Sequence, residues 1–224
     1  MSILPDALRR SPLFRDLPDA EIRALIGEMN GRVLSLDRHE TLYRPSDPAR
    51  GIFIVLTGSV LAFHDDLWGN RHTVADFPPG AIFGLPYAIL PGATMSLTAT
   101  ASTESTILSL DVLRILRSPE LSPRHQALST NLLLILAEKL ADGVEHLAHM
   151  NHRTTRNKLL SYLSAEARRQ RSCTFTVPFN RQELADYLGV QRAAMCAELS
   201  RMRREGLIDF QRGRFTLLTV DHLP

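Results

Sequence analysis

The chain has 224 residues, of which 44% are hydrophobic, with 26 Lys and Arg against 24 Asp and Glu and only two cysteines. The length allows one large or two modest domains, and the ordinary composition excludes collagen-like, disordered and purely coiled-coil proteins. Two cysteines are too few for a disulfide scaffold or for a four-cysteine zinc or iron–sulfur site. No apolar run approaches the ~20 residues that span a bilayer, and no signal peptide is evident, so we expect a cytoplasmic protein without a membrane partner.

The net charge of +2 is the balance of two opposite contributions. Residues 1–150 carry 13 basic and 17 acidic side chains, a net charge of −4, whereas residues 151–224 carry 13 and 7, a net charge of +6. A basic segment that follows an acidic one hints at nucleic-acid binding, although a solvated basic face is the commoner cause of such a difference.

The first two thirds of the chain predict a short helix followed by a β-structure. Residues 17–28 have acidic residues first and apolar residues at helical spacing, which predicts a surface helix. Short apolar or β-branched runs then alternate with turn residues such as Thr57-Gly58, which favours a β-sandwich or β-roll over βαβ units. The runs that we expect as strands are 52–56, 60–63, 73–77, 97–101 and 105–110.

A short helix over 111–117 precedes a long helical pattern that begins beyond Pro123 and reaches Met150. At 1.5 Å per residue the long helix measures roughly 35–40 Å, and one small domain would have difficulty covering a helix of that length. We therefore expect a seam between two copies of the chain, and the alternative is a stripe that packs only within its own chain. The apolar stripe of this helix consists of Leu128, Leu132, Ile135 or Leu136, Leu140, Val144, Leu147 and Met150.

Residues 181–200 have the pattern of a helix-turn-helix. Helix 154–169 and a strand at 174–177 come before it, and Asn180 with Glu183 forms a capping-box-like start. Gly189 supplies the sharp turn where a positive φ is needed, and Ala185 allows a close helix crossing. The second helix ends at Gly206, and a hairpin around Gly213 predicts a wing. The apolar positions that bury the two helices are Leu184, Leu188, Val190, Met195 and Leu199. An ordinary helical hairpin is the alternative interpretation.

A β-roll, a long helix and a C-terminal winged helix-turn-helix resemble the Crp/Fnr family of bacterial transcription regulators over essentially the whole chain. The segments that carry the resemblance in the N-terminal half are 13–18, 43–47, 52–60 and 79–84. The resemblance implies an α+β fold with a cyclic-nucleotide-binding-like jelly roll at 1–121, a dimerisation helix and hinge at 122–152 and a DNA-binding domain at 153–224. It also implies a homodimer, a palindromic DNA operator, and RNA polymerase as a candidate partner.

The expected DNA contacts lie on the second helix of the motif. Arg192 can contact guanine O6 and N7, and Gln191 can contact adenine or a phosphate. Where the family commonly has Glu and Arg, this chain has Ala193 and Ala197, so we expect an unusual operator. Cys196 and Ser200 share the groove-facing side, although a filler at the edge of the core is the better interpretation of Cys196. Expected phosphate or register contacts are Arg181, Arg201, Arg203, Arg204, Arg212 and Arg214.

The effector expected in the β-roll is not a cyclic nucleotide. Cyclic-nucleotide-binding members carry Gly-Glu and Arg-Ser/Thr-Ala segments, whereas this chain has Gly84-Leu85 and Met95-Ser96-Leu97, so a buried phosphate would lack a cation. No cysteine precedes Cys173, so the iron–sulfur branch is excluded as well. The effector pocket is therefore expected to be apolar. Its expected lining is Leu85, Tyr87, Ile89, Met95, Ser96 and Leu97, with Leu133, Leu136 and Leu140 of the long helix.

Three possibilities for the effector stay open: haem, a small hydrophobic or aromatic anion, and no ligand. The candidate haem ligands, none of them strong, are His64, His72, Met95 and His149. His146, His149 and His152 have a spacing that could hold a metal ion, but a solvated stripe is the favoured interpretation. No motif of a nucleotide hydrolase, zinc protease or serine hydrolase is present, so we do not expect an enzyme. The alternative function is a cyclic-nucleotide-binding-like regulatory module that acts without sequence-specific DNA binding.

Overall fold

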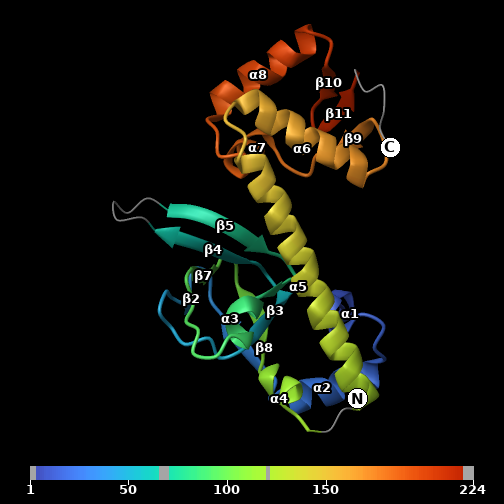
Figure 1. Ribbon diagram of the computed structural model, residues 1–224. Coiled ribbons are helices and arrows are strands. Elements are labelled where there is room, and N and C mark those ends of the chain that lie inside the picture. The colour runs from blue at the N-terminus through green and yellow to red at the C-terminus, as the bar shows by residue number, and fades with distance from the viewer. Residues whose placement is uncertain (1–3, 66–70, 120–121, 219–224) are drawn as a thin grey trace. The chain divides into compact units, whose positions relative to one another are not determined.

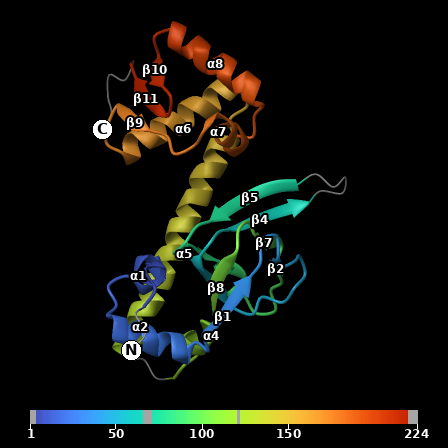
Figure 2. The same cartoon turned by 180° about the vertical axis from the view of Figure 1, so that it is seen from behind.

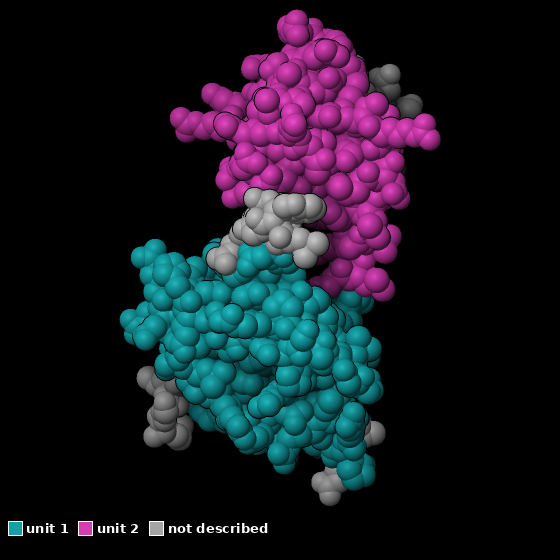
Figure 3. Space-filling view, turned by 90° about the vertical axis from the view of Figure 1, so that its left-hand side faces the viewer, with its two compact units in different colours: residues 1–138 teal, residues 139–224 magenta. Residues whose placement is uncertain are grey.

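The computed structural model describes residues 4–65, 71–119 and 122–218 (Figure 1). The chain divides into two compact units, which Figure 3 shows in different colours. The N-terminal unit spans residues 1–138 and the C-terminal unit residues 139–224. The long helix Pro123–Met150 (α5) begins in the first unit, and its last residues belong to the second.

The N-terminal unit contains two antiparallel four-stranded sheets, so the β-roll expected from the sequence is confirmed. One sheet has the strand order β1-β8-β3-β6 and the other the order β2-β7-β4-β5. The strands are Arg32–Leu36 (β1), Thr41–Tyr43 (β2), Ile52–Thr57 (β3), Val60–Asp65 (β4), Arg71–Phe77 (β5), Ile82–Phe83 (β6), Thr98–Ala101 (β7) and Ser105–Leu110 (β8). Helices of this unit are Asp6–Arg10 (α1), Asp19–Glu28 (α2), Leu85–Ile89 (α3) and Leu113–Leu116 (α4), with a 3₁₀ turn at Pro12–Phe14.

Strand β3 is buried on both of its faces, which explains its continuous apolar sequence. Because side chains alternate along a strand, Ile52 and Ile54 face one core and Phe53 and Val55 the other. The first core lies under helices α1, α2 and the beginning of α5, which Figure 2 shows side by side. The second core lies between the two sheets and holds an aromatic group around Phe83.

The apolar residues of helix α5 lie on two different faces, one buried and one exposed. The single apolar stripe expected from the sequence is therefore wrong for the first half of the helix. Leu128, Leu132 and Ile135 are buried in the core of their own unit. A different row of apolar side chains is exposed, with Leu133 67% and Leu140 69% exposed. With Val144 and Leu147, this row has spacings of seven, four and three residues, which fit the a and d positions of a coiled-coil seam.

The C-terminal unit is a helix-turn-helix followed by a three-stranded sheet. Its helices are Thr155–Arg169 (α6), Arg181–Tyr187 (α7) and Arg192–Arg204 (α8), and its strands are Thr174–Thr176 (β9), Ile208–Gln211 (β10) and Arg214–Leu217 (β11). The sheet order is β10-β11-β9, so the hairpin expected as a wing pairs with the strand that precedes α7. Helix α8 packs against both α6 and α7.

Candidate DNA interface and effector cavity

Helix α7 begins with the capping box that its sequence predicts. The Asn180 side chain accepts hydrogen bonds from the backbone N–H groups of Gln182 and Glu183 at 2.8 and 3.0 Å. In return, the Glu183 carboxylate accepts the backbone N–H of Asn180 at 2.7 Å. Because these groups have no partner within the helix, the box fixes where α7 starts.

The turn between α7 and α8 depends on Gly189. Its φ is +58°, in the left-handed region that costs other residues strain, and this confirms the conformation expected for it. A Cβ atom at this position would lie 2.6 Å from the Met150 methyl group at the end of α5. The Lys158 ammonium group also donates to the Leu188 carbonyl at 2.9 Å, which satisfies a free acceptor at the end of α7.

The core beneath the motif is the one that the apolar pattern predicts. Leu184, Ala185, Leu188, Met195 and Leu199 are all at most 1% exposed. Helix α8 is also fixed to α6 by Arg156, which pairs with Glu198 at 3.4 Å and with Glu205. The hydrogen bond from Arg156 lowers the pKa of Glu205, and the same contact raises the pKa of Arg156. Helix α8 is thus held along its length, and its opposite side is left exposed.

The exposed side of α8 carries the expected base-reading residues. Gln191 is the N-cap, and Arg192, Ala193, Ala197 and Ser200 are exposed. The Ser200 hydroxyl donates to the Cys196 carbonyl within the helix at 2.9 Å. Cys196 itself is half-buried and packs against the core, as the filler interpretation of this residue predicts. The sequence placed it among the groove-facing residues, but its side chain is shared with the interior.

Arg181 and Arg203 differ from the freely exposed cations that the sequence suggests. The Arg181 guanidinium lies 4.9 Å from the ring centroids of both Phe210 and Phe215, and it donates to the Arg212 carbonyl at 3.3 Å. Burial lowers the pKa of Arg181. Arg203 pairs with Asp209 at 2.7 Å and lies 5.3 Å from the Phe210 ring. Both side chains therefore fasten the wing to the helices. The sequence did not indicate this role for Arg181, because its aromatic partners are about 30 positions away.

The other expected phosphate contacts are exposed on α8 and the wing. Arg201 pairs weakly with Glu198 at 3.6 Å, and Arg204 donates to the Ser200 carbonyl at 3.4 Å. Arg212 and Arg214 flank the turn of the wing and form no ion pair within the described residues. Together with Arg192, these exposed arginines of α8 and the wing are called the basic face.

The residues expected to line the effector pocket do not surround one cavity. Leu85 is buried in the core under α5, with Ile89 and Leu136 packed against that core. The Tyr87 hydroxyl forms a hydrogen bond with Ser96, and Leu97 is half-buried. Leu133 and Leu140 are exposed, and Leu140 belongs to the C-terminal unit. The expected lining residues are therefore divided between the core under α5, the core between the sheets and the surface.

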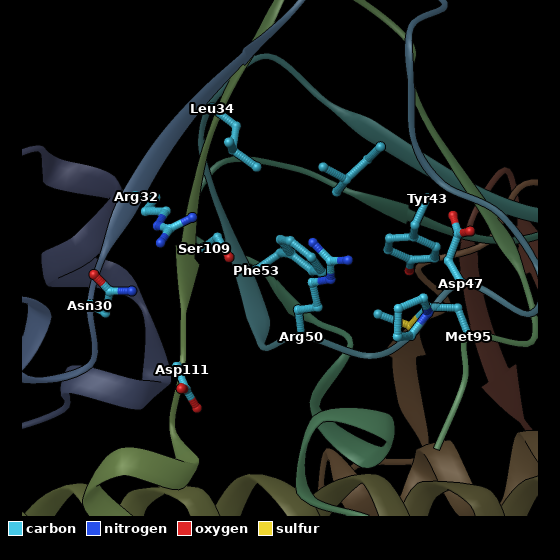
Figure 4. A pocket seen from close by; sticks show the side chains of 12 residues that line it. Asn30, Arg32, Leu34, Tyr43, Asp47, Arg50, Phe53, Met95, Ser109 and Asp111 are labelled. Atoms are coloured by element: carbon cyan, nitrogen blue, oxygen red, sulfur yellow. The ribbon is translucent and has the colours of Figure 1, made fainter. Parts of the chain in front are cut away.

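A cavity of about 590 Å³ lies elsewhere in the β-roll, and Met95 is the member of the expected set that lines it (Figure 4). Its wall is partly charged, contrary to the apolar lining expected. Besides Met95, the lining residues are Asn30, Arg32, Leu34, Leu42, Tyr43, Asp47, Pro48, Arg50, Phe53, Ser109 and Asp111. The sequence did not single out the two arginines, which are 18 positions apart and meet only through strand pairing.

The candidate haem ligands lie in different parts of the fold. His149 belongs to the C-terminal unit, where it is buried and bonded to the Ser161 hydroxyl at 2.8 Å. Met95 lies in the N-terminal unit within the core between the sheets, and His64 is exposed on β4. His72 pairs with His64 in the strand register, but its side chain lies outside the described residues. Met95 is the candidate whose described side chain lines the cavity of the β-roll, and no second candidate lines that cavity among the described residues.

The three histidines at the end of α5 are not the solvated stripe expected from their spacing. His149 is 3% exposed, the His146 ring lies tilted against Tyr187 with ring centroids 4.4 Å apart, and of the three only His152 is exposed. Burial lowers the pKa of His149. Within the part of the chain that the structure describes, no group of three His, Cys, Asp or Glu side chains could hold a metal ion.

Comparisons with known proteins match both units. Residues 33–117 match the cyclic nucleotide-binding domain, and residues 157–223 match the Crp-like helix-turn-helix domain. The Cyclic AMP receptor protein of Thermus thermophilus is 24% identical over 90% of this chain and 89% of its own. The Transcriptional regulatory protein btr of Bordetella pertussis is 26% identical over 92% of this chain and 85% of its own. None of the helices described here is long and apolar enough to cross a membrane.

Solved structures share the fold. The catabolite activator protein of Thermus thermophilus matches with a TM-score of 0.54 at 23% identity, over 92% of this chain and 93% of that one. The c-di-GMP responsive global regulator CLP of Xanthomonas campestris matches with a TM-score of 0.58 at 17% identity, over 91% of this chain and all of that one. A β-roll, a long helix and a winged helix-turn-helix with a basic face define a DNA-binding transcription regulator. The chain belongs to the Crp/Fnr family.

Proposed function

We propose that this protein is a homodimeric, sequence-specific transcription regulator that recognises an inverted repeat in DNA. The observation that carries the proposal is the exposed side of α8. The core and Arg156 hold this helix in place, while Gln191 and Arg192 are exposed and can reach base edges. Arg192 supplies the bidentate donor that reads guanine, and the alanines beside it offer methyl contacts to thymine. The cations of the basic face supply contacts to phosphate.

The dimer is supported by the exposed apolar row on α5. Leu133, Leu140, Val144 and Leu147 are each 59–69% exposed, and such a row is costly to leave in water. Two copies paired along this row would bury it and would present two α8 helices. Half-sites read by such a pair are expected about one helical turn apart, on the order of 34 Å.

A cyclic nucleotide is not the effector in this proposal. Where the family resemblance places the phosphate-binding Arg, this chain has Met95, which is 3% exposed among aromatic rings. Leu85, at the place of the ribose-binding Glu, is fully buried in the core. Neither Leu85 nor Met95 supplies the polar or cationic group that the family uses at its position to hold a cyclic nucleotide, so a phosphate placed there in the family's way would lose its hydration without an ion pair from Met95. Haem is left out of the proposal because its candidate ligands do not share a cavity.

The test is selection of bound duplexes from a library with a random central segment, using the full chain. We expect enrichment of an inverted repeat that contains a guanine in each half-site. Recovery of no enriched motif, with all duplexes bound alike, would contradict sequence-specific regulation and favour the regulatory-module alternative. Titration of the same protein with cyclic AMP in a calorimeter is expected to give no binding heat.

A further inference from the structure

The cavity bounded by Arg32, Arg50 and Phe53 is built by the register of three neighbouring strands. Arg32 on β1 pairs with Ser109 on β8, and Ser109 pairs in turn with Phe53 on β3. Phe53 then pairs with Phe83 on β6. Directly opposed residues of antiparallel strands place their side chains on the same face, about 4.5–5.5 Å apart at Cβ. The sheet therefore presents a row that changes from a cation through a hydroxyl to stacked aromatic rings.

The aromatic end of the row is an extended apolar wall. Phe53 stacks on Phe83 with ring centroids 5.3 Å apart, and Tyr43 lies 5.7 Å from Phe53. Leu34 and Met95 continue the same wall. Burial raises the pKa of Tyr43 to about 12, so its hydroxyl stays protonated at neutral pH and can donate a hydrogen bond.

The cationic part of the wall consists of the side chains of Arg32 and Arg50. Neither guanidinium group forms a hydrogen bond or an ion pair with any described residue. Both guanidinium groups point inward toward the Phe53 ring (Figure 4). Two like charges that share one cavity repel each other, and a bound anion would remove that repulsion. Arginine also matches the planar carboxylate better than any other side chain, because its donors form a fork.

The two acidic residues of the wall do not neutralise these cations. The Asp47 carboxylate accepts a hydrogen bond from the backbone N–H of Arg44 at 2.7 Å, so it is engaged within its own loop. The Asp111 side chain points away from the two guanidinium groups (Figure 4). No ion pair joins either carboxylate to Arg32 or Arg50 in the described part of the chain.

We propose that this cavity binds a small amphipathic carboxylate, with the acid group between Arg32 and Arg50 and an aromatic or branched apolar body against Phe53, Tyr43 and Met95. The volume of about 590 Å³ is within the roughly 300–1,000 Å³ that small-molecule sites occupy. This site differs from the expected pocket under α5, with which it shares only Met95. That this cavity is the effector site of a regulator rests on the proposed function, whereas the binding of a carboxylate in it does not.

The experiment titrates the full chain, without DNA, with three probes of one shape in a calorimeter at low salt. The probes are 4-phenylbutanoate, its neutral amide 4-phenylbutanamide and the cation 4-phenylbutylamine. We expect saturable binding of the carboxylate, at least tenfold tighter than the amide, and no saturable binding of the amine. Equal binding of carboxylate and amide, preference for the amine, or no saturable binding of the carboxylate would each overturn the proposal.

Two variants locate the site. Arg50→Gln and Arg32→Gln are expected to weaken carboxylate binding about tenfold each and to leave amide binding unchanged. The control is Arg38→Gln, which removes an exposed arginine of the same unit that does not line the cavity. An Arg38→Gln loss as large as that of Arg50→Gln would show a general charge effect and overturn the assignment. Because DNA is absent, a failure of DNA recognition is scored separately, by the library selection.

Discussion

Two sets of arginines, one in each unit, have opposite surroundings. In the C-terminal unit, Arg156, Arg181 and Arg203 are tied to carboxylates and aromatic rings, and they hold the helices and the wing together. In the N-terminal unit, Arg32 and Arg50 line a cavity without any partner in the described residues. The comparison shows that a charge count of the sequence does not assign a role to an arginine. That role depends on the residues that surround the guanidinium group in the fold.

The largest expected effect separates the two faces of α5. Leu132 is buried in the N-terminal core, so Leu132→Ala should lower the free energy of unfolding by about 2–5 kcal/mol. Leu140 is exposed in the single chain, so Leu140→Ala should change that free energy little at low concentration and should instead weaken self-association. Urea unfolding and sedimentation equilibrium of both variants measure the two effects. If Leu132→Ala and Leu140→Ala behaved alike in both experiments, the division of the helix into two faces would be wrong.

A second prediction concerns the turn of the C-terminal unit. Gly189→Ala should cost about 1–2 kcal/mol, because the backbone is left-handed there and the new methyl group would press on Met150. The matched control is Gly143→Ala, a position on α5 with open space around it, where alanine should stabilise the helix by roughly 0.5–1 kcal/mol. Hydrogen exchange should report the Gly189→Ala loss in the C-terminal unit alone. A loss spread evenly over both units would contradict their independence.

A third prediction tests the arginines of the wing. Arg181→Gln should destabilise the C-terminal unit by about 1 kcal/mol, because it removes the contacts to Phe210 and Phe215. Arg201→Gln, on the exposed side of α8, should change stability by less than about 0.5 kcal/mol. Thermal unfolding of the two variants compares them directly. The reverse order of the two losses would show that Arg181 acts as a free surface cation.

The smallest expected effect is a dependence of stability on pH. Because burial lowers the pKa of His149 in the folded chain, protonation favours the unfolded chain as the pH falls below about 6.5. The C-terminal unit should therefore lose stability between pH 7 and pH 5, and His149→Gln should reduce that loss. His152→Gln, which changes an exposed histidine, should leave the pH dependence intact. An unchanged profile in His149→Gln would assign the effect to other groups.

The sequence predicted local features of the fold better than contacts between distant segments. The capping box at Asn180, the turn at Gly189 and the burial of Leu184 and Leu199 follow from residues within one or two helical turns. The positions of strands β3, β4, β5, β7 and β8 were also predicted closely, because alternation and turn residues are local signals, whereas the two-residue strand β6 was not predicted.

The cavity could not be predicted in the same way. It joins Arg32 to Ser109 and Ser109 to Phe53, pairs that are 77 and 56 positions apart, and only the register of the sheet brings them together. The role of Arg181 was missed for the same reason, since its aromatic partners lie on the wing. The prediction for the long helix was partly wrong because its apolar residues lie on two faces. Periodicity alone does not say which of these faces packs against its own chain.

The most direct test of the account is the affinity of Arg192→Ala for a selected operator and for a scrambled duplex, each measured over a range of salt concentrations. Arg192 is exposed at the start of α8, and a bidentate contact to guanine contributes roughly 1–3 kcal/mol of discrimination. The account predicts that specific affinity falls by that amount, whereas affinity for the scrambled duplex and its steep decline with salt change little. Equal losses on the two duplexes would contradict base reading by α8.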